Sequence, residues 1–303
     1  MQTALLLPPL PLRRLRMPEA GIRQGLIVSR CITCVVFYVG PAGYPIGSKN
    51  PIDALERVRG LGFNALEVEF VRQARMDEGK ARSIGSKAEE LGILLSAHAP
   101  YYVNFNSVSR ATVNKSVEWV VKTARIADLM GAWVIVIHAA SYSGRSPEAA
   151  TKAVIRGLKR CRVTMEEEGL RPMLGLETMG RKGTWGTLRE IRDVMEDVGG
   201  SIPVLDFGHL HARDGGRFRS VADFQGAMDE VESMYEGDLH CHFSCIEYSG
   251  AGEIRHLPLE AKEPDFSLLA KVLRTSRKNV TVISETPLPE KGALRMKRIL
   301  AIR

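Results

Sequence analysis

The sequence predicts a single-domain (β/α)₈ barrel, and two observations support that fold class. Eight short apolar runs alternate with eight segments of helical periodicity between residues 35 and 302, and strand–helix alternation implies parallel strands joined by right-handed crossovers. Eight such units over about 270 residues suit a closed barrel, which typically needs ~250 residues. The alternative, an open doubly wound sheet, favours a GxGxxG first turn, and Gly40-Pro41-Ala42-Gly43 contains none.

The first half of the chain supplies four strands and three helices. We expect strand 35–39 to be closed by Gly40 and Pro41, and helix 51–60 has a proline at its start and a glycine stop. Strand 65–70 precedes helix 77–91, which is rich in Ala, Lys and Glu, and strand 94–98 precedes the amphipathic helix 112–130. Residues 133–138 form a nearly continuous apolar run, the kind that parallel sheets bury.

The second half continues the same alternation. Helix 147–169 has a proline in its first turn and a glycine at its stop, where these residues are favoured. Strand 173–177, helix 187–198, strand 202–206, helix 221–234 and strand 239–243 follow. Helix 266–277, strand 280–285 and helix 292–302 complete the eight units.

Charge and cysteine usage give weaker information. The formal net charge is +7, of which residues 1–30 hold +4, from five arginines against one glutamate. The remaining +3 is compatible with a polyanionic substrate without requiring one. Five scattered cysteines, an odd number, indicate a reducing compartment, so we expect a cytoplasmic protein. Cys31 and Cys34 have CxxC spacing, but no second pair completes a zinc knuckle.

Residues 1–33 are expected to be a disordered extension of the barrel domain, 34–303. The apolar run 5–12 precedes its arginines, the wrong order for a secretory signal, and its prolines oppose a spanning helix. Met17 is an internal candidate for the start of translation. We expect no membrane segment, and a monomer.

Potential metal ligands recur at the ends of the expected strands. They stand about one βα unit apart, at Glu69, His98, His138, Glu177, Asp206, His242 and Glu285. The ends of barrel strands converge on one mouth, and burying so many polar side chains there is costly unless something pairs them. Metal cations can do so, because imidazole nitrogen and carboxylate oxygen suit zinc, manganese or iron. The sequence therefore predicts a polynuclear metal site, to which His209 and His256 also belong.

Simpler interpretations exist for single members of this set. His138 alone could be a hydrogen-bonded core residue, and Glu69 could pair with Arg72 or Arg75. His211 is left outside the predicted site. His240 has the same strand parity as His242 but lies further down the strand, so no role follows for it.

At these residues the chain resembles endonuclease IV. The order and spacing of the motifs match over about residues 36–300, on Ser96–Asn104, Val136–Ser141, Leu176–Thr178, Asp206–His209 and Ser284–Pro287. Gly40–Gly43 and Leu66–Phe70 are similar to a divergent, largely archaeal branch. The wider superfamily includes xylose-isomerase-like sugar isomerases, so the fold alone does not decide the function.

The resemblance implies a DNA-repair enzyme that cleaves the phosphodiester 5′ to an abasic site with two or three zinc ions, or manganese. One metal would take His98, His138 and Glu177, and a second would share Glu177 with Asp206, His242 and Glu285. The third would take His209 and His256. Glu177 and Glu285 would be catalytic, and Glu285 would orient or deprotonate the attacking water. Substrate would contact Tyr101, Tyr102, Asn104, Glu69 and Arg255, with the two tyrosines wedged into the DNA.

Several departures from the family pattern affect the third metal and the phosphate contacts. The family has an Asp two residues before its last histidine, whereas this chain has Ile254, and the nearest carboxylate is Glu253. We expect Glu253 to serve only if the chain bulges there. Basic residues in the expected loops could hold DNA, namely Arg72, Arg75, Arg181, Lys182, Arg213 and Arg217. The alternative function is a sugar or sugar-phosphate isomerase or epimerase with one or two divalent metals and a closed pocket.

Overall fold

The computed structural model describes residues 35–72 and 74–302. The expectations for the extension 1–33 and for the Cys31–Cys34 pair therefore lie outside the described residues. Within the described residues, no helix is both long and apolar enough to cross a membrane.

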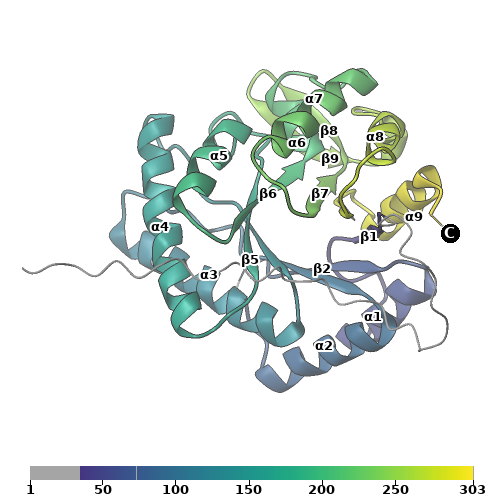
Figure 1. Ribbon diagram of the computed structural model, residues 1–303, viewed down its shortest axis with the longest axis horizontal. Coiled ribbons are helices and arrows are strands. Elements are labelled where there is room, and N and C mark those ends of the chain that lie inside the picture. Colours follow the sequence, from purple (N-terminus) through teal and green to yellow (C-terminus); the bar gives the residue numbers. More distant parts are fainter. Residues whose placement is uncertain (1–34, 73, 303) are drawn as a thin grey trace, which may run out of the picture. The chain divides into compact units, whose positions relative to one another are not determined.

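Eight parallel strands form the barrel, as the sequence predicted. Their order in the sheet is β1-β10-β7-β6-β5-β4-β3-β2, and neighbouring strands in that order pair in parallel. Their bounds are β1 (Phe37–Pro41), β2 (Ala65–Glu69), β3 (Leu94–His98), β4 (Val134–Ile137), β5 (Met173–Glu177), β6 (Ser201–Asp206), β7 (Leu239–Phe243) and β10 (Val280–Ser284). Figure 1 shows the helices arranged around these strands.

The barrel closes between β1 and β2 through a few contacts instead of a full ladder. One bridge joins Ala42 to Glu67, and the side chain of Asn64 accepts from the Val39 amide (2.8 Å) and donates to the Phe37 carbonyl (2.9 Å). Gly40 permits the approach, because a Cβ there would lie 1.8 Å from the Ala65 carbonyl oxygen. The expected end of the first strand was wrong: β1 runs through Gly40 and Pro41 instead of ending before them.

Eight helices follow the barrel strands with bounds close to those expected. They are α1 (Pro51–Gly60), α2 (Glu78–Leu91), α3 (Arg110–Met130), α4 (Pro147–Glu167), α5 (Leu188–Asp197), α7 (Val221–Glu232), α8 (Phe266–Leu273) and α9 (Pro289–Leu300). Polar N-caps set many of the starts; the side chain of Asn50 begins α1, and Thr187 and Glu190 form a capping box at α5. Left-handed glycines end α2 and α3.

Two features at the mouth were not predicted. A short helix α6 (Phe207–Arg213) starts directly after β6, in a stretch for which no helix was predicted. The strands β8 (Cys245–Ser249) and β9 (Gly252–Leu257) form an antiparallel hairpin after β7, followed by a 3₁₀ turn at Leu259–Ala261. Both insertions belong to the mouth, and they carry His209, Glu253 and His256.

Candidate metal centre

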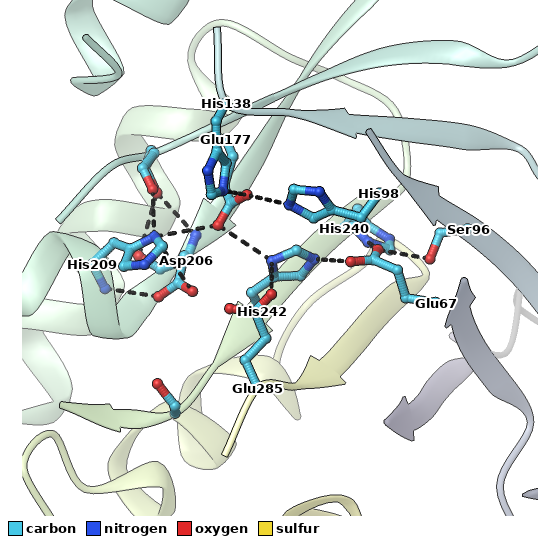
Figure 2. A network of polar contacts seen from close by, with 12 residues as sticks. Glu67, Ser96, His98, His138, Glu177, Asp206, His209, His240, His242 and Glu285 are labelled. Carbon is cyan, nitrogen blue, oxygen red and sulfur yellow. Dashed lines mark hydrogen bonds and ion pairs between the residues drawn. The ribbon is translucent and has the colours of Figure 1, made fainter. Parts of the chain in front are cut away.

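A buried carboxylate, that of Glu177 at the end of β5, lies at the centre of the site. Its Oε2 is 2.7 Å from Nε2 of His138 and 3.2 Å from Nε2 of His98. Its Oε1 is 3.2 Å from Nδ1 of His209 and 3.4 Å from Nδ1 of His242. Figure 2 shows these four imidazoles turned toward the one carboxylate. Burial by itself raises the pKa of Glu177, but the neighbouring histidines lower it well below the usual range.

Three groups of potential ligands surround Glu177. In each group the ligand atoms lie within 4.8 Å of one another: His98, His138 and Glu177; Glu177, Asp206, His242 and Glu285; and His209, Glu253 and His256. These groups contain nine side chains, namely the eight that the resemblance assigned to metal and Glu253. Seven of them come from strand ends or the helix directly after β6, and two from the hairpin.

Asp206 combines a structural and a potential ligand role. It ends β6 and is the N-cap of α6, where its Oδ1 accepts from the amide of His209 at 2.7 Å. Its other oxygen, Oδ2, is buried and has no hydrogen-bond partner among the described residues. Burial raises the pKa of Asp206 to about 6, and the charges of Glu285 and Glu177 act in the same direction. This Oδ2 lies 3.5 Å from Nδ1 of His209, and a buried carboxylate oxygen without a hydrogen bond is one that a cation could coordinate.

The hairpin supplies the third group by means of a β-bulge. Glu253 and His256 are three residues apart and would face opposite sides of a regular strand. Ile254, however, has no partner in the ladder: Arg255 pairs with Glu247 and Glu253 with Tyr248. The extra residue restores Glu253 to the same side as His256. Oε1 of Glu253 is 3.8 Å from Nε2 of His256, and Oε2 of Glu253 is 3.5 Å from Nε2 of His209.

Gly180, in the loop after β5, allows the hairpin to lie this close. A Cβ on Gly180 would be 2.8 Å from Cβ of Glu253 and 3.0 Å from the His209 ring. The amide of Glu253 donates to the Gly180 carbonyl at 3.2 Å. The bulge that was required if Glu253 was to replace the family's Asp is therefore present.

The donor set fits divalent metal ions. It offers only imidazole nitrogen and carboxylate oxygen, which suits zinc or manganese. Burial lowers the pKa of His98, but its hydrogen bond to Glu177 and that carboxylate's charge outweigh this and raise it to about 9. The carboxylates likewise raise the pKa of His209 and His242 well above the usual range, against the effect of burial. In the metal-free protein the protonated histidines would offset the charge of the carboxylates. Metal binding would release these protons, because a metal ion binds the neutral imidazole.

A cavity of about 670 Å³ opens over the three groups. Tyr101 and Tyr102 are 40% and 59% exposed on its rim, and the Tyr101 ring lies 4.8 Å from that of His98. Glu69 also lines the cavity and accepts a hydrogen bond of 3.5 Å from Tyr101, but it belongs to none of the three groups. The strand-end carboxylate of β2 is thus not placed among the potential metal ligands.

Other residues expected to bind substrate have polar side-chain groups that already contact the protein. The side-chain oxygen of Asn104 accepts from the amides of Asn106 (3.1 Å) and Ser141 (3.4 Å), so this residue braces two loops at the cavity wall. Arg255 forms an ion pair with Glu247 at 2.6 Å and does not line the cavity. Arg213, one of the basic residues suggested for DNA, donates to three loop carbonyls, those of Met179, Arg181 and Thr184.

Sequence reasoning missed Glu67 and left His240 without a role. Both are completely buried, and Nε2 of His240 lies 2.9 Å from Oε2 of Glu67. Nε2 of His242 lies 3.0 Å from Oε1 of the same carboxylate. The available signal was strand parity: Glu67 stands two residues before Glu69, as His240 does before His242, so both pairs face the barrel interior one layer apart.

His211, left outside the predicted site, also lies outside it in the structure. Its Nδ1 accepts from the Phe218 amide at 3.1 Å and its Nε2 contacts Glu263 at 2.7 Å. Glu263 in turn accepts from the hydroxyl of Tyr248 on β8 at 3.3 Å. His211 therefore links α6 to the hairpin.

Comparisons with known proteins agree with this arrangement. Residues 55–301 match the model of the xylose isomerase-like TIM barrel family. The chain is 31% identical over 264 residues to an uncharacterized protein of Methanocaldococcus jannaschii, covering 86% of this chain and 95% of that protein. It is 30% identical over 213 residues to a probable endonuclease 4 of Latilactobacillus sakei, covering 66% and 67% of the two chains.

Solved structures show the same fold in proteins of different activity. Endonuclease IV from Thermus thermophilus superposes with a TM-score of 0.67 at 19% identity, covering 88% of this chain and 99% of that one. A D-tagatose 3-epimerase-like protein gives 0.67 at 17% identity, covering 86% and 96%. At these identities the likeness concerns the fold alone. The barrel topology and the family match together show that the chain belongs to the xylose isomerase-like TIM barrel family.

Proposed function

We propose that this protein is a metal-dependent phosphodiesterase that hydrolyses the DNA backbone 5′ to abasic sites. The observation that carries the proposal is the set of three ligand groups around Glu177, including the group completed by the bulged hairpin. Relatives named as probable endonuclease 4 support the same class of reaction. An isomerase with one or two metals would have no use for the third group.

The nine potential ligands and Tyr101 would have different roles in this reaction. The nine ligands would hold two or three zinc or manganese ions, which when bound supply a hydroxide nucleophile at neutral pH and neutralise charge on phosphate. Glu177 would keep the groups at a fixed separation, because each of its oxygens faces a different pair of histidines. Tyr101, packed on the His98 ring, would restrict water on that side of the cavity.

Glu285 would act on the attacking water. It lines the cavity, with Oε1 3.1 Å from Nδ1 of His242 and Oε2 3.9 Å from Nδ1 of His256. Burial raises the pKa of Glu285, but the charge of His242 and its hydrogen bond prevail and lower it to about 2. The ionised carboxylate can only accept, so it would orient a water through that water's proton.

Substrate would enter across the open rim. Arg181 is the one arginine or lysine among the described residues that line the cavity, and it would contact a phosphate. Tyr102 is the more exposed of the two tyrosines and lies 6.3 Å, ring to ring, from Trp119 on α3. Such aromatic surface suits insertion against an unstacked base or into the gap at an abasic site.

The test is nicking of a labelled duplex that carries one reduced abasic site, by zinc-loaded protein whose metal content has been measured. We expect a single cut 5′ to the lesion, none in the same duplex without it, and none with Glu285→Gln. Three bound metals without nicking would refute the proposal. Epimerisation of a ketohexose by the same preparation would instead favour the isomerase alternative.

A further inference from the structure

A further buried carboxylate lies one layer below the candidate metal groups. Glu67, on β2, is completely buried and meets two histidines of β7 across the barrel interior (Figure 2). Its Oε2 accepts from the hydroxyl of Ser96 at 2.8 Å and lies 2.9 Å from Nε2 of His240. Its Oε1 lies 3.0 Å from Nε2 of His242 in an ion pair, and neither of these two atoms has a hydrogen-bond partner among the described residues.

His242 can use only one nitrogen toward a metal ion when the other carries hydrogen. Its Nδ1 faces the candidate metal groups, at 3.4 Å from Glu177 and 3.1 Å from Glu285. Its Nε2 faces away from them, toward Glu67. We propose that Glu67 is a positioning residue, which holds hydrogen on Nε2 of His242 and so keeps the lone pair of Nδ1 directed at the metal.

His240 and Ser96 fix the carboxylate itself. Both contact Oε2, so the Glu67 side chain cannot turn without losing two partners, and Oε1 stays on the His242 side. Carboxylates that accept from the second nitrogen of a ligating histidine set its tautomer and ring orientation, and raise its basicity. This inference depends on the metal-binding part of the proposed function and not on its DNA substrate.

A fourth metal among Glu67, His240 and His242 is the competing interpretation, because their ligand atoms also lie within 4.8 Å of one another. The 2.9 Å between Nε2 of His240 and Oε2 of Glu67 is a hydrogen-bond distance, and the 3.0 Å between Nε2 of His242 and Oε1 of Glu67 is almost as short. Ligands at ~2.0–2.1 Å around a tetrahedral zinc stand roughly 3.3 Å apart. His242 would moreover have to bind metal through both nitrogens. The geometry favours positioning.

The test compares Glu67→Met, which removes both acceptor oxygens at similar volume, with Glu67→Gln, which keeps one. Glu190→Gln is the matched control, because it alters another buried carboxylate, at the capping box of α5, that contacts none of the candidate ligands. Zinc retained per chain is measured against a graded competing chelator. Nitrogen-15 NMR of labelled histidines in zinc-loaded wild-type protein reports the tautomer of His242.

We expect Glu67→Met to weaken the binding of one zinc equivalent by about 10–100-fold, Glu67→Gln to recover part of it, and Glu190→Gln to change nothing. In the wild type, hydrogen should be on Nε2 of His242. Equal zinc retention in Glu67→Met, hydrogen on Nδ1, or loss of a fourth zinc equivalent overturns the inference. If Glu67→Met does not fold, the NMR result and Glu67→Gln still decide. Absence of DNA nicking leaves these readouts unaffected.

Discussion

The shared carboxylate of Glu177 gives the most specific prediction, and Glu177→Gln is the variant that tests it. The Oε2 atom serves His98 and His138, whereas Oε1 faces His209 and His242. Glutamine has one oxygen and one NH₂ group, which donates and cannot bind a metal. In either orientation of the amide, one side therefore loses its oxygen ligand and the other keeps a neutral one. We expect bound metal to fall by at least one equivalent per chain.

The same change should reduce activity strongly. A metal that supplies several kcal/mol of charge stabilisation corresponds to about 10²–10³ in rate. Metal content after dialysis is measured by elemental analysis, and nicking of the abasic duplex under single-turnover conditions gives the rate. Glu190→Gln, in which the altered carboxylate lies at the capping box of α5, should match wild type in both assays. An unchanged metal content in Glu177→Gln would refute the assignment of a shared ligand.

Three further predictions concern the hairpin, the protons of the metal-free site and the rim. Glu253→Ala should remove one metal equivalent per chain. The control Glu247→Gln, on the other strand of the hairpin and paired with Arg255, should keep every metal equivalent in the same elemental analysis. Equal metal content in the two variants would exclude Glu253 as a ligand. Because the pKa of His98 is raised to about 9 by Glu177, its protonation stabilises the metal-free fold fully below pH ~6.5. The melting temperature of chelated protein should therefore fall as the pH rises from 6.5 through 9, and zinc affinity measured by calorimetry should increase over the same range; a flat profile would contradict the ion pair. Tyr102→Ala should weaken binding of abasic duplex about 10-fold, as expected for one lost stacking contact of 1–3 kcal/mol, without loss of metal; unchanged affinity by fluorescence anisotropy would remove Tyr102 from the interface.

The barrel was predictable because its signals are local. Each strand is a short apolar run and most helices carry a proline, a polar cap or a glycine at an end, so eight repeats could be counted without any knowledge of contacts. The ligands at strand ends followed from the same count, because parallel strands of a barrel end at one mouth.

What was missed depends on pairings between distant segments. The hairpin β8–β9 follows β7 at a place where the strand–helix alternation leads one to expect a helix. Its bulge at Ile254 can be recognised only once Glu253 is known to pair with Tyr248. Glu67 and His240 lie 173 positions apart in the chain, and only the barrel closure brings them together. Helix α6 is too short for helical periodicity to be recognised, so Asp206 was predicted as the end of a strand and not also as an N-cap.

The sparse joint between β1 and β2 has a consequence for how the barrel opens. This joint has one bridge, the backbone hydrogen bonds from Asn64 to Val39 (3.3 Å) and from Gly43 to Glu67 (2.9 Å), and the Asn64 side chain in place of a full ladder. It should therefore separate at lower free energy than the other seven, and its amides should exchange hydrogen first. Glu67 lies on the β2 side of that joint and reaches across the interior to β7. Transient opening would thus move Glu67 away from His242. Bound metal would hold β7 in place and so would slow the opening of the β1–β2 joint, although it contacts neither side of that joint.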